Sequence, residues 1–339
     1  MAGIVSATRL RRIAGYLGSF AKNATPERLA NLVQNEWEYR TGALRLSSFA
    51  PTITIDITNR CMLRCPLCAT GRRETGRPAV TMDVADFEQI VREIADRSFQ
   101  LFLYCWGDPL LVPHLADYIR IARHANLAVT LSSNLSMKLS DDAIDALVLS
   151  GPDRLIVSLD GTDAATYATY RIGGNFDRVR QNALRIAQAR SRLQAKRPVL
   201  IWQFLAFAHN YRQLSAAESI YRAWGFDGFE VEKPNLPFGN RNREEASKWF
   251  APDPALRVKG PPDLKDNLGN RCFWPWRAAV IQADGALSPC CYTAQPDTDV
   301  GNVIDQGFAG AWNDPRMVAL RKTLTSTGNA EPCCTCRKE

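Results

Sequence analysis

Ten cysteines, most of them clustered, constrain this chain of 339 residues more than any other feature. They lie at positions 61, 65, 68, 105, 272, 290, 291, 333, 334 and 336. The first 22 residues lack the clean apolar core of a secretory signal. We therefore expect a cytoplasmic protein whose grouped thiols bind metal rather than pair as disulfides.

The composition excludes several other classes of protein. Hydrophobic residues make up 46% of the chain and charged residues 23%, which excludes intrinsic disorder and a small disulfide scaffold. The net charge of +7 is spread among acidic residues, so we expect no nucleic-acid partner. The sequence contains no run of 18 or more apolar residues, so we expect no transmembrane helix. The length suits one large α/β domain with an appendage.

Residues 51–233 alternate between strand-like and helix-like segments. The expected strands are 52–57, 99–105, 127–133, 154–160, 199–207 and 229–233, and the expected helices lie near 82–95, 114–125, 141–149, 175–194 and 212–224. This alternation predicts a parallel sheet with right-handed crossovers. We therefore expect an α/β fold, a partial (β/α)6 TIM-like barrel.

The segments on either side of the barrel have different characters. Residues 1–50 suit a helical N-terminal extension, in which Leu10, Ile13, Leu17 and Phe20 follow helical spacing. That first helix packs on the body, or contacts a membrane surface or partner, or belongs to a transit peptide. Residues 234–270 are Pro-rich and form a linker.

Residues 271–339 form a small cysteine-rich C-terminal domain. Its first part predicts a β-hairpin that turns at Asp284-Gly285, because this dipeptide favours tight two-residue turns. Residues 308–325 predict one helix.

Cys61, Cys65 and Cys68 have the spacing C-x3-C-x2-C directly after the first strand, where α/β barrels place active-site loops. Three thiolates can bind three irons of a four-iron cluster and leave the fourth iron open to a small molecule. Zinc is the alternative, but structural zinc usually takes four ligands from paired motifs. The three histidines, at 114, 124 and 209, have no zinc spacing relative to this loop. We favour iron–sulfur chemistry.

Three further segments lie at the ends of predicted strands: CWGDPLL (105–111), SSN (132–134) and VSLDG (157–161), and TYRIGG (169–174) comes shortly after the last of them. With the cysteine loop, they make residues 51–232 resemble the radical S-adenosylmethionine (SAM) superfamily. The resemblance implies a [4Fe-4S] cluster on Cys61, Cys65 and Cys68 that cleaves SAM reductively. The resulting 5′-deoxyadenosyl radical then abstracts a hydrogen atom from the substrate.

The resemblance also implies residues that contact SAM. Gly107 and Asp108, with Pro109, would hold its amino group, and Ser158 and Arg171 would contact its ribose and carboxylate. The other expected contacts are Leu67, Ser133, Asn134 and Asp160. Residues 132–134 have a simpler alternative as a strand-to-helix cap. Asp108 is shorter than the usual glutamate, Leu67 stands in place of an aromatic residue, and Met62 and Cys105 also depart from the family pattern.

The C-terminal cysteines resemble the auxiliary-cluster SPASM domain in its shortened, twitch-type form. The resemblance implies one auxiliary [4Fe-4S] cluster on Cys272, Cys290, Cys333 and Cys336, where either pair of adjacent cysteines can exchange roles. A zinc ribbon is the alternative. Cys105, Cys291 and Cys334 are then left over, either as small buried hydrophobic residues or with one of them as the hydrogen-atom donor of an epimerase.

The substrate has the weakest sequence signal. Gln203, Glu230 and Glu232 alternate with apolar residues, so they either line the barrel and bind hydroxyl or amino groups, or are solvent-facing or paired polar residues. Our leading hypothesis is hydrogen abstraction from a polar small molecule, sugar- or aminocyclitol-like, giving dehydrogenation or epimerisation. The alternatives are maturation of a ribosomal peptide and a non-catalytic iron–sulfur electron carrier. The expected reductant is of the flavodoxin or ferredoxin type.

Overall fold

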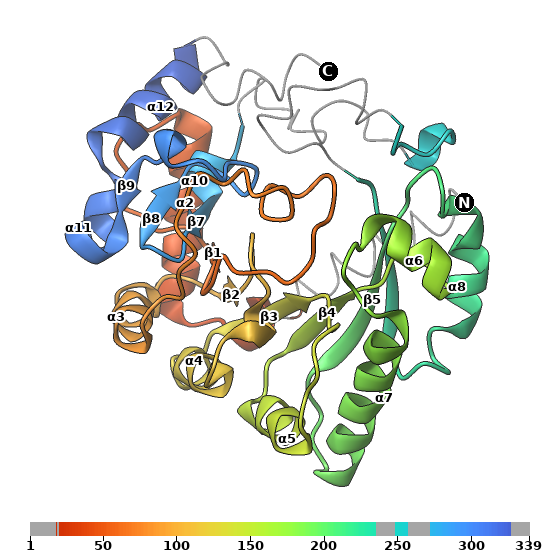
Figure 1. The fold of residues 1–339 in the computed structure, drawn as a ribbon. Helices are drawn as coiled ribbons and strands as arrows, with labels where there is room; N and C mark the ends of the chain where they lie inside the picture. The colour runs from red at the N-terminus through yellow and green to blue at the C-terminus, as the bar shows by residue number, and fades with distance from the viewer. Residues whose placement is uncertain (1–17, 19, 235–247, 257–271, 327–339) are drawn as a thin grey trace.

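A mostly parallel sheet organises the computed structural model, which describes residue 18 and residues 20–234, 248–256 and 272–326 (Figure 1). Within these residues nine strands form one sheet in the order β6-β5-β4-β3-β2-β1-β7-β8-β9. They are β1 (Thr52–Ile55), β2 (Gln100–Phe102), β3 (Ala128–Ser133), β4 (Arg154–Ser158), β5 (Val199–Leu205), β6 (Gly228–Glu232), β7 (Ala278–Ile281), β8 (Ala286–Ser288) and β9 (Gly301–Asn302).

The six strands β1 to β6 are parallel and pair in chain order, as the alternating pattern predicts. The hairpin predicted at Asp284-Gly285 joins β7 to β8, and Gly285 provides the left-handed turn with φ +79°. Strand β7 pairs in parallel with β1, so the C-terminal hairpin extends the same sheet. Among the described residues β6 and β9 are unpaired edges of this sheet, so closure of a barrel is not seen.

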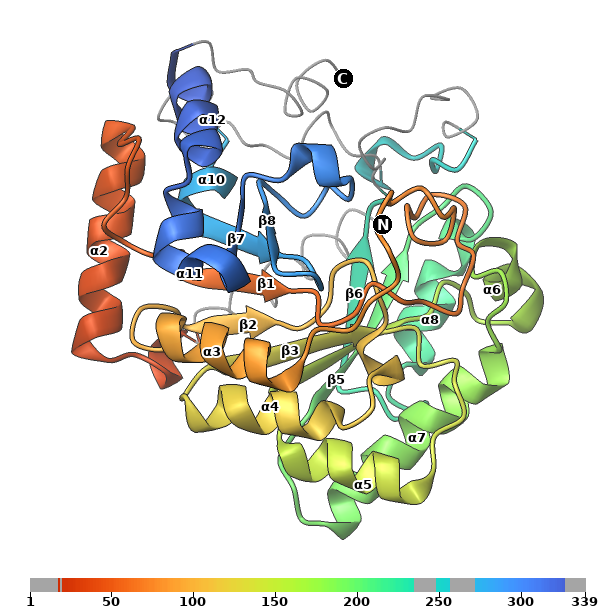
Figure 2. The ribbon, with the colours of Figure 1, turned by 60° about the vertical axis from the view of Figure 1, so that its left-hand side comes forward.

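Helices cover the outer face of the sheet (Figures 1 and 2). The main ones are α3 (Val84–Ile94), α4 (Leu115–His124), α5 (Asp141–Ser150), α7 (Phe176–Arg192) and α8 (Leu214–Ile220). Side chains toward these helices are apolar and fully buried, for example Leu101, Leu131 and Trp202. Side chains on the other face are more polar and often half-buried, such as Ser132 and Gln203. Because side chains alternate along a strand, the inner face can carry chemistry while the outer face forms the core.

Two helices stand where the sequence predicts one over residues 308–325, so that prediction is wrong. Helix α11 (Val303–Trp312) ends before α12 (Pro315–Ser326) begins. Pro315 has no N–H for a continuing helix, and the Asp314 carboxylate accepts the Arg316 N–H at 2.9 Å as a cap. The chain also has a short helix α6 (Ala164–Tyr170) that the sequence did not predict, and the helix predicted near 212–224 shortens to α8 behind a turn of 3-10 helix, η2 (Tyr211–Gln213).

Short helical segments complete the structure. They are η1 (Pro109–Leu111), η3 (Pro254–Leu256), η4 (Pro296–Thr298) and α10 (Trp274–Arg277). The predicted linker is described at residue 234 and over residues 248–256, where Phe250 bridges to Phe207 and so ties the segment to the end of β5.

Helix α2 (Pro26–Thr41) lies on the side where the strands begin (Figure 2). It docks through a buried polar face. The Arg28 guanidinium donates to the carbonyls of Asn23, Ala95, Ala125 and Asn126 at 2.6–2.9 Å. Ala95 and Ala125 end helices α3 and α4, so this cation meets the negative ends of both helices.

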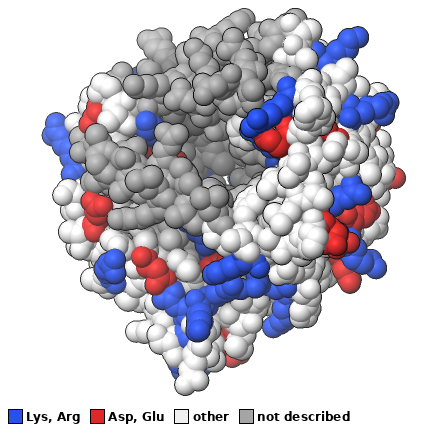
Figure 3. Space-filling model, turned by 180° about the vertical axis from the view of Figure 1, so that it is seen from behind, with Lys and Arg blue, Asp and Glu red and all other residues white. Residues whose placement is uncertain are grey.

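The outer face of α2 exposes three large apolar side chains, Leu29, Val33 and Trp37. The predicted first helix lies almost entirely outside the described residues, so its contact with a membrane or partner stays a prediction. Among the described residues, no helix has both the length and the apolar character needed to span a bilayer. Lys and Arg gather on the lower part of the rear face, with Asp and Glu beside them (Figure 3).

We expect Arg28→Ala to lower the free energy of unfolding by about 3 kcal/mol, because several buried carbonyls lose a charged donor. Arg40→Ala is the control, since Arg40 is exposed and pairs with Glu36 one helical turn away, and it should cost below about 0.5 kcal/mol. Anaerobic denaturant titration followed by circular dichroism measures both. Equal losses in the two variants would contradict this role of Arg28.

Candidate functional site

The loop with Cys61, Cys65 and Cys68 follows β1, as predicted, and a bridge between Thr58 and Thr81 closes its base. Cys65 is buried, and the other two thiols are half-buried. The Cys68 N–H donates to the Cys65 carbonyl at 3.1 Å, so these two residues share a tight turn. The loop lies over the end of the sheet in Figure 1.

The environment of the three thiols suits a positively charged metal cluster. The pKa of Cys61 is raised to about 12 and that of Cys65 to about 11, mainly by burial and in smaller part by the neighbouring cysteines. Such thiols keep their protons at neutral pH unless a metal takes the proton's place. In the described part of the chain, no three His, Cys, Asp or Glu side chains converge on one ion. A four-iron cluster instead binds each thiolate to a different iron.

Two buried polar atoms beside this loop support the same fit. Thr70 Oγ1 and Trp106 Nε1 have no hydrogen-bond partner among the described residues. Thr70 follows the last cysteine of the loop by two residues, and Trp106 lies in the CWGDP segment. Because buried polar atoms are normally paired, both positions suit contact with a bound group.

The CWGDP segment packs directly on the chain that leads to Cys61. A Cβ added to Gly107 would lie 1.7 Å from the Thr58 carbonyl oxygen, so only glycine fits at this position. The Asp108 N–H donates to the Arg60 carbonyl at 2.8 Å. The predicted SAM segment and the cysteine loop therefore form one unit.

Asp56 anchors this unit from below, and sequence reasoning missed it. Its carboxylate accepts the backbone N–H groups of Cys105, Trp106 and Gly107 at 3.0–3.3 Å. Burial raises its pKa to about 7, although the three N–H groups act in the opposite direction. The signal in the sequence was an acidic residue at the end of an otherwise apolar strand.

Asp108 is buried, and Ser133 and Asn134 surround it. Its carboxylate accepts the Ser133 hydroxyl at 2.8 Å, the Asn134 N–H at 2.9 Å and the Leu110 N–H at 3.1 Å. Burial raises its pKa, against these hydrogen bonds. Pro109 is buried and starts the η1 turn that Asp108 caps. The Asn134 side-chain amide lies 3.8 Å from the Cys61 sulfur, so this group reaches the cysteine loop.

Ser133 and Asn134 also have the local capping contacts of the alternative interpretation. The Ser133 hydroxyl accepts the Leu135 N–H, and the Asn134 side-chain oxygen Oδ1 accepts the Ser136 N–H, both at 2.9 Å. Contact of Asp108, Ser133 and Asn134 with SAM stays a prediction.

Arg171 brings a positive charge to Cys65. Its Nε donates to Asp160 at 2.5 Å, and its Nη1 lies 4.0 Å from the Cys65 sulfur. Although burial opposes the charge, the Asp160 carboxylate holds the pKa of Arg171 well above its usual value. Asp160 in turn accepts the Leu205 N–H at 2.8 Å. The structure thus connects two predicted SAM residues, Asp160 and Arg171, to the cysteine loop.

An apolar shell encloses the middle of the cysteine loop. Leu63, Cys65 and Leu67 are buried against Tyr170 and Phe207, and the partly buried Trp249 packs on them. The Tyr170 and Phe207 rings are 4.2 Å apart. Leu67 therefore lies in an aromatic environment although it is aliphatic itself.

The structure places Cys105 close to the second cysteine group. Its sulfur lies 3.9 Å from the Cys291 carbonyl oxygen. Burial raises the Cys105 pKa well above its usual value, and the Asp56, Cys291 and Cys290 charges add to the effect. Cys290 is buried, whereas Cys272 and Cys291 are half-buried. Cys333, Cys334 and Cys336 lie outside the described residues, so the auxiliary ligand set stays a prediction.

The predicted substrate residues share the inner face of the sheet. Strand register places Ser158, Gln203 and Glu230 in one row, with Glu232 beside Leu205. Glu230 is buried and pairs with Arg154 at 2.5 Å, as in the alternative of a paired polar residue. Contact of these side chains with substrate stays a prediction.

Comparison with known proteins agrees with this geometry. The family model described as the radical SAM superfamily matches residues 55–194, and the model for SPASM, an iron–sulfur cluster-binding domain, matches residues 272–337. The chain is 24% identical over 323 residues to a PqqA peptide cyclase of Gluconobacter oxydans (strain 621H), covering 87% of this chain and 85% of the relative.

Two solved structures share the fold. SuiB of Streptococcus suis bound to its precursor peptide SuiA has a TM-score of 0.62 at 15% identity, and covers 86% of this chain and 71% of that chain. BtrN in complex with AdoMet and 2-DOIA has a TM-score of 0.53 at 16% identity, and covers 86% of this chain and 94% of that chain.

Anaerobically reconstituted protein should contain about eight irons, because two four-iron clusters are expected. Cys65→Ala should retain about four irons and lose reductive SAM cleavage, since one iron of the open cluster loses its ligand. Cys105→Ala is the control and should keep the full iron content. About four irons in the unchanged protein would contradict the auxiliary cluster, and SAM cleavage by Cys65→Ala would contradict the loop assignment.

Asp56→Ala should raise the Kd for SAM about tenfold or more, because three backbone N–H groups of the CWGDP segment lose their acceptor. Asp56→Asn keeps one acceptor oxygen and should show a smaller rise. Asp177→Ala is the control, since Asp177 is exposed on α7. Anaerobic calorimetry measures the three constants, and an unchanged Kd in Asp56→Ala would overturn this role.

Proposed function

Because the chain belongs to the radical SAM superfamily and carries a SPASM domain, we propose that it matures a peptide made by the ribosome. Membership implies a [4Fe-4S] cluster, SAM and auxiliary iron–sulfur binding. When bound, the open cluster supplies the electron that cleaves SAM and so starts hydrogen-atom abstraction. In this proposal a peptide replaces the small molecule as the leading substrate. The protein is then an enzyme and not a non-catalytic electron carrier.

The observation that carries the proposal is the span of the likeness to peptide-modifying proteins. The PqqA peptide cyclase aligns over 87% of this chain, which is far more than the 41% that the radical SAM match covers (140 of 339 residues). SuiB, whose structure holds its precursor peptide, has the same arrangement over 86% of this chain. Both likenesses therefore extend well beyond the residues that the radical SAM model matches.

The residues of this chain have separable tasks in such a reaction. Cys61, Cys65 and Cys68 would hold three irons and leave the fourth to SAM. Arg171 places a fixed positive charge beside Cys65, where it stabilises the thiolate form. Asp56 and Gly107 hold the CWGDP backbone close to the loop, so its N–H groups and Asp108 can orient SAM. Preorganisation of this kind is what the protein supplies to a cofactor-driven reaction.

The inner face of the sheet offers hydrogen-bonding groups to the substrate. Ser158, Gln203 and Glu230 form a row next to the segments expected to bind SAM. Gln203 is half-buried and can donate to and accept from a peptide amide. Arg154 balances the charge of Glu230, so this row presents polarity without a bare buried charge.

A second candidate is dehydrogenation or epimerisation of a sugar- or aminocyclitol-like small molecule. The observation that favours it is the match to BtrN, which covers 94% of that chain, so the two proteins have similar extents. In an epimerising version, Cys105, Cys291 or Cys334 would donate the returning hydrogen atom.

The two candidates are separated by mass spectrometry. The reconstituted protein is incubated with SAM, dithionite and either the peptide encoded by a small gene beside this one or an aminocyclitol. We expect the peptide to lose two hydrogens for each SAM consumed, as in a cross-link or desaturation. Conversion of the aminocyclitol with an unchanged peptide would reject the peptide proposal. In deuterated water, a small-molecule product of unchanged mass without deuterium would reject the epimerase version.

A further inference from the structure

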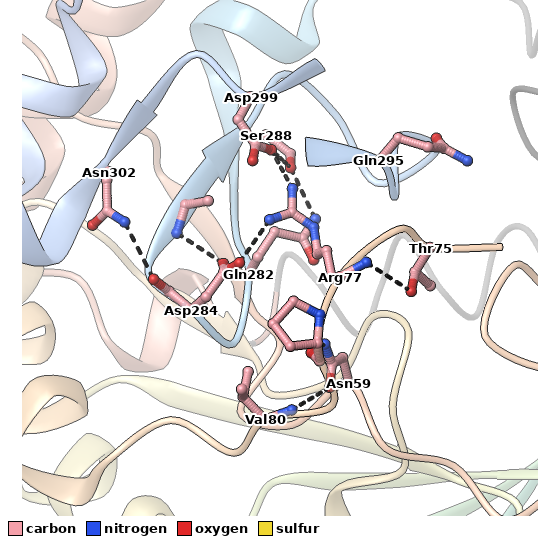
Figure 4. A network of polar contacts seen from close by, with 12 residues as sticks. Asn59, Thr75, Arg77, Val80, Gln282, Asp284, Ser288, Gln295, Asp299 and Asn302 are labelled. Atoms are coloured by element: carbon pink, nitrogen blue, oxygen red, sulfur yellow. Dashed lines mark hydrogen bonds and ion pairs between the residues drawn. The ribbon is translucent and has the colours of Figure 1, made fainter. Parts of the chain in front are cut away.

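We propose that Arg77 is a positioning residue (Figure 4). It fixes the C-terminal cysteine segment, which is the stretch from Asp284 to Asp299 that carries Cys290 and Cys291, against the loop of Cys61, Cys65 and Cys68. Arg77 lies on the return part of that loop, between Cys68 and β2. Its side chain is 3% exposed, which is unusual for a cation. The inference holds for a peptide or a small-molecule substrate, because it concerns only how the two cysteine groups are held together.

Among the described residues, the three polar contacts of the Arg77 guanidinium all lie in the segment from Asp284 to Asp299. Nη1 pairs with Asp284 at 2.8 Å, Nη2 pairs with Asp299, and Nε donates to the Ala294 carbonyl at 2.9 Å. Asp284 is in the turn between β7 and β8, and Asp299 lies before β9. Figure 4 shows the guanidinium between the two carboxylates. A planar guanidinium can bridge two acids in this way, whereas the ammonium of lysine cannot match the geometry.

The other side of the network leads to the first cysteine group. Asn59 accepts the Val80 N–H at 2.8 Å and donates to the Pro78 carbonyl at 2.7 Å. Asn59 lies two residues before Cys61, and Pro78 follows Arg77 directly. Asn59 therefore connects the backbone at Arg77 to the start of the cysteine loop, as Figure 4 shows.

Cys290 and Cys291 lie between the two aspartates that Arg77 binds. Ser288 donates to Asp299 at 3.0 Å and accepts from Gln282 at 2.9 Å, and the Thr293 hydroxyl donates to the Cys290 carbonyl at 2.9 Å. A further contact joins this segment to the first cysteine loop, because the Gln295 side-chain amide donates to the Glu74 carbonyl at 3.3 Å. The cysteine segment is thus held on both sides of the pair.

The sheet alone does not provide this fixation. Pairing of β7 with β1 holds the base of the hairpin, over residues 278–281. In the part of the chain that the structure describes, residues 289–299 follow β8 and pair with no strand, so side-chain contacts hold them in place. Without Arg77, Asp284 and Asp299 would face each other with no cation between them, and like charges at close range repel. Arg77 therefore sets the distance between the two cysteine groups.

The test compares Arg77→Gln and Arg77→Lys with Arg123→Gln in the reconstituted protein. Arg123 is a matched control, because it pairs with Asp153 at the opposite ends of the strands. Hydrogen exchange by mass spectrometry and the midpoint potential of the auxiliary cluster are measured. Arg77→Gln should speed exchange over residues 284–302 about tenfold or more and shift that potential, while exchange in β3–β5 stays unchanged.

Arg77→Lys should fall between Arg77→Gln and the unchanged protein, which keeps the test valid if Arg77→Gln does not fold. The double variant Arg77→Gln with Asp299→Asn should recover part of the protection, because the repulsion is removed. Unchanged exchange and potential in both single Arg77 variants would overturn the proposal. So would an increase spread evenly over the chain and matched by Arg123→Gln, since this would indicate a general loss of stability.

Discussion

Strand β1 is hydrogen-bonded on both sides, to β2 and to β7, and the candidate site depends on this arrangement. All three strands are parallel, so their C-terminal ends open at one edge of the sheet. The cysteine loop, the CWGDP segment and the turn toward Cys290 leave from that edge. If β7 paired with another strand, the two cysteine groups would lie apart. They could not then contribute to the same site.

Buried charges hold the loops at this edge. Asp56, Asp108 and Asp160 are almost fully buried, and each accepts backbone N–H groups from a neighbouring loop or strand. These bonds offset the cost of removing a carboxylate from water and give each loop one position. Arg171 and Arg77 act differently, because they bring positive charge to a thiol and to the C-terminal segment respectively.

The two faces of the sheet have different tasks in the proposed reaction. The outer face is apolar and packs on helices, which makes the strands rigid. The inner face carries the polar row of Ser158, Gln203 and Glu230, which we propose faces the substrate. Rigid strands with polar inward side chains suit a reaction that needs substrate held close to a reactive group and away from water.

The sequence by itself determined the strands β1 to β6, the position of the CWGDPLL, SSN and VSLDG segments at strand ends, and the three thiols of the first loop. These are local features, because apolar and polar residues alternate with a period of two along a strand, and the C-x3-C-x2-C motif lies within one short stretch of sequence. The break between α11 and α12 also has a local signal in the sequence, which is Pro315. Only the tertiary structure decided that β7 joins β1, that Asp56 anchors the CWGDP segment, and that Arg77 meets Asp284 and Asp299. Arg77 and Asp284 are 207 residues apart, and a pair so distant leaves no pattern in the neighbouring sequence. Such contacts form only when the folded sheet brings the two segments to the same edge.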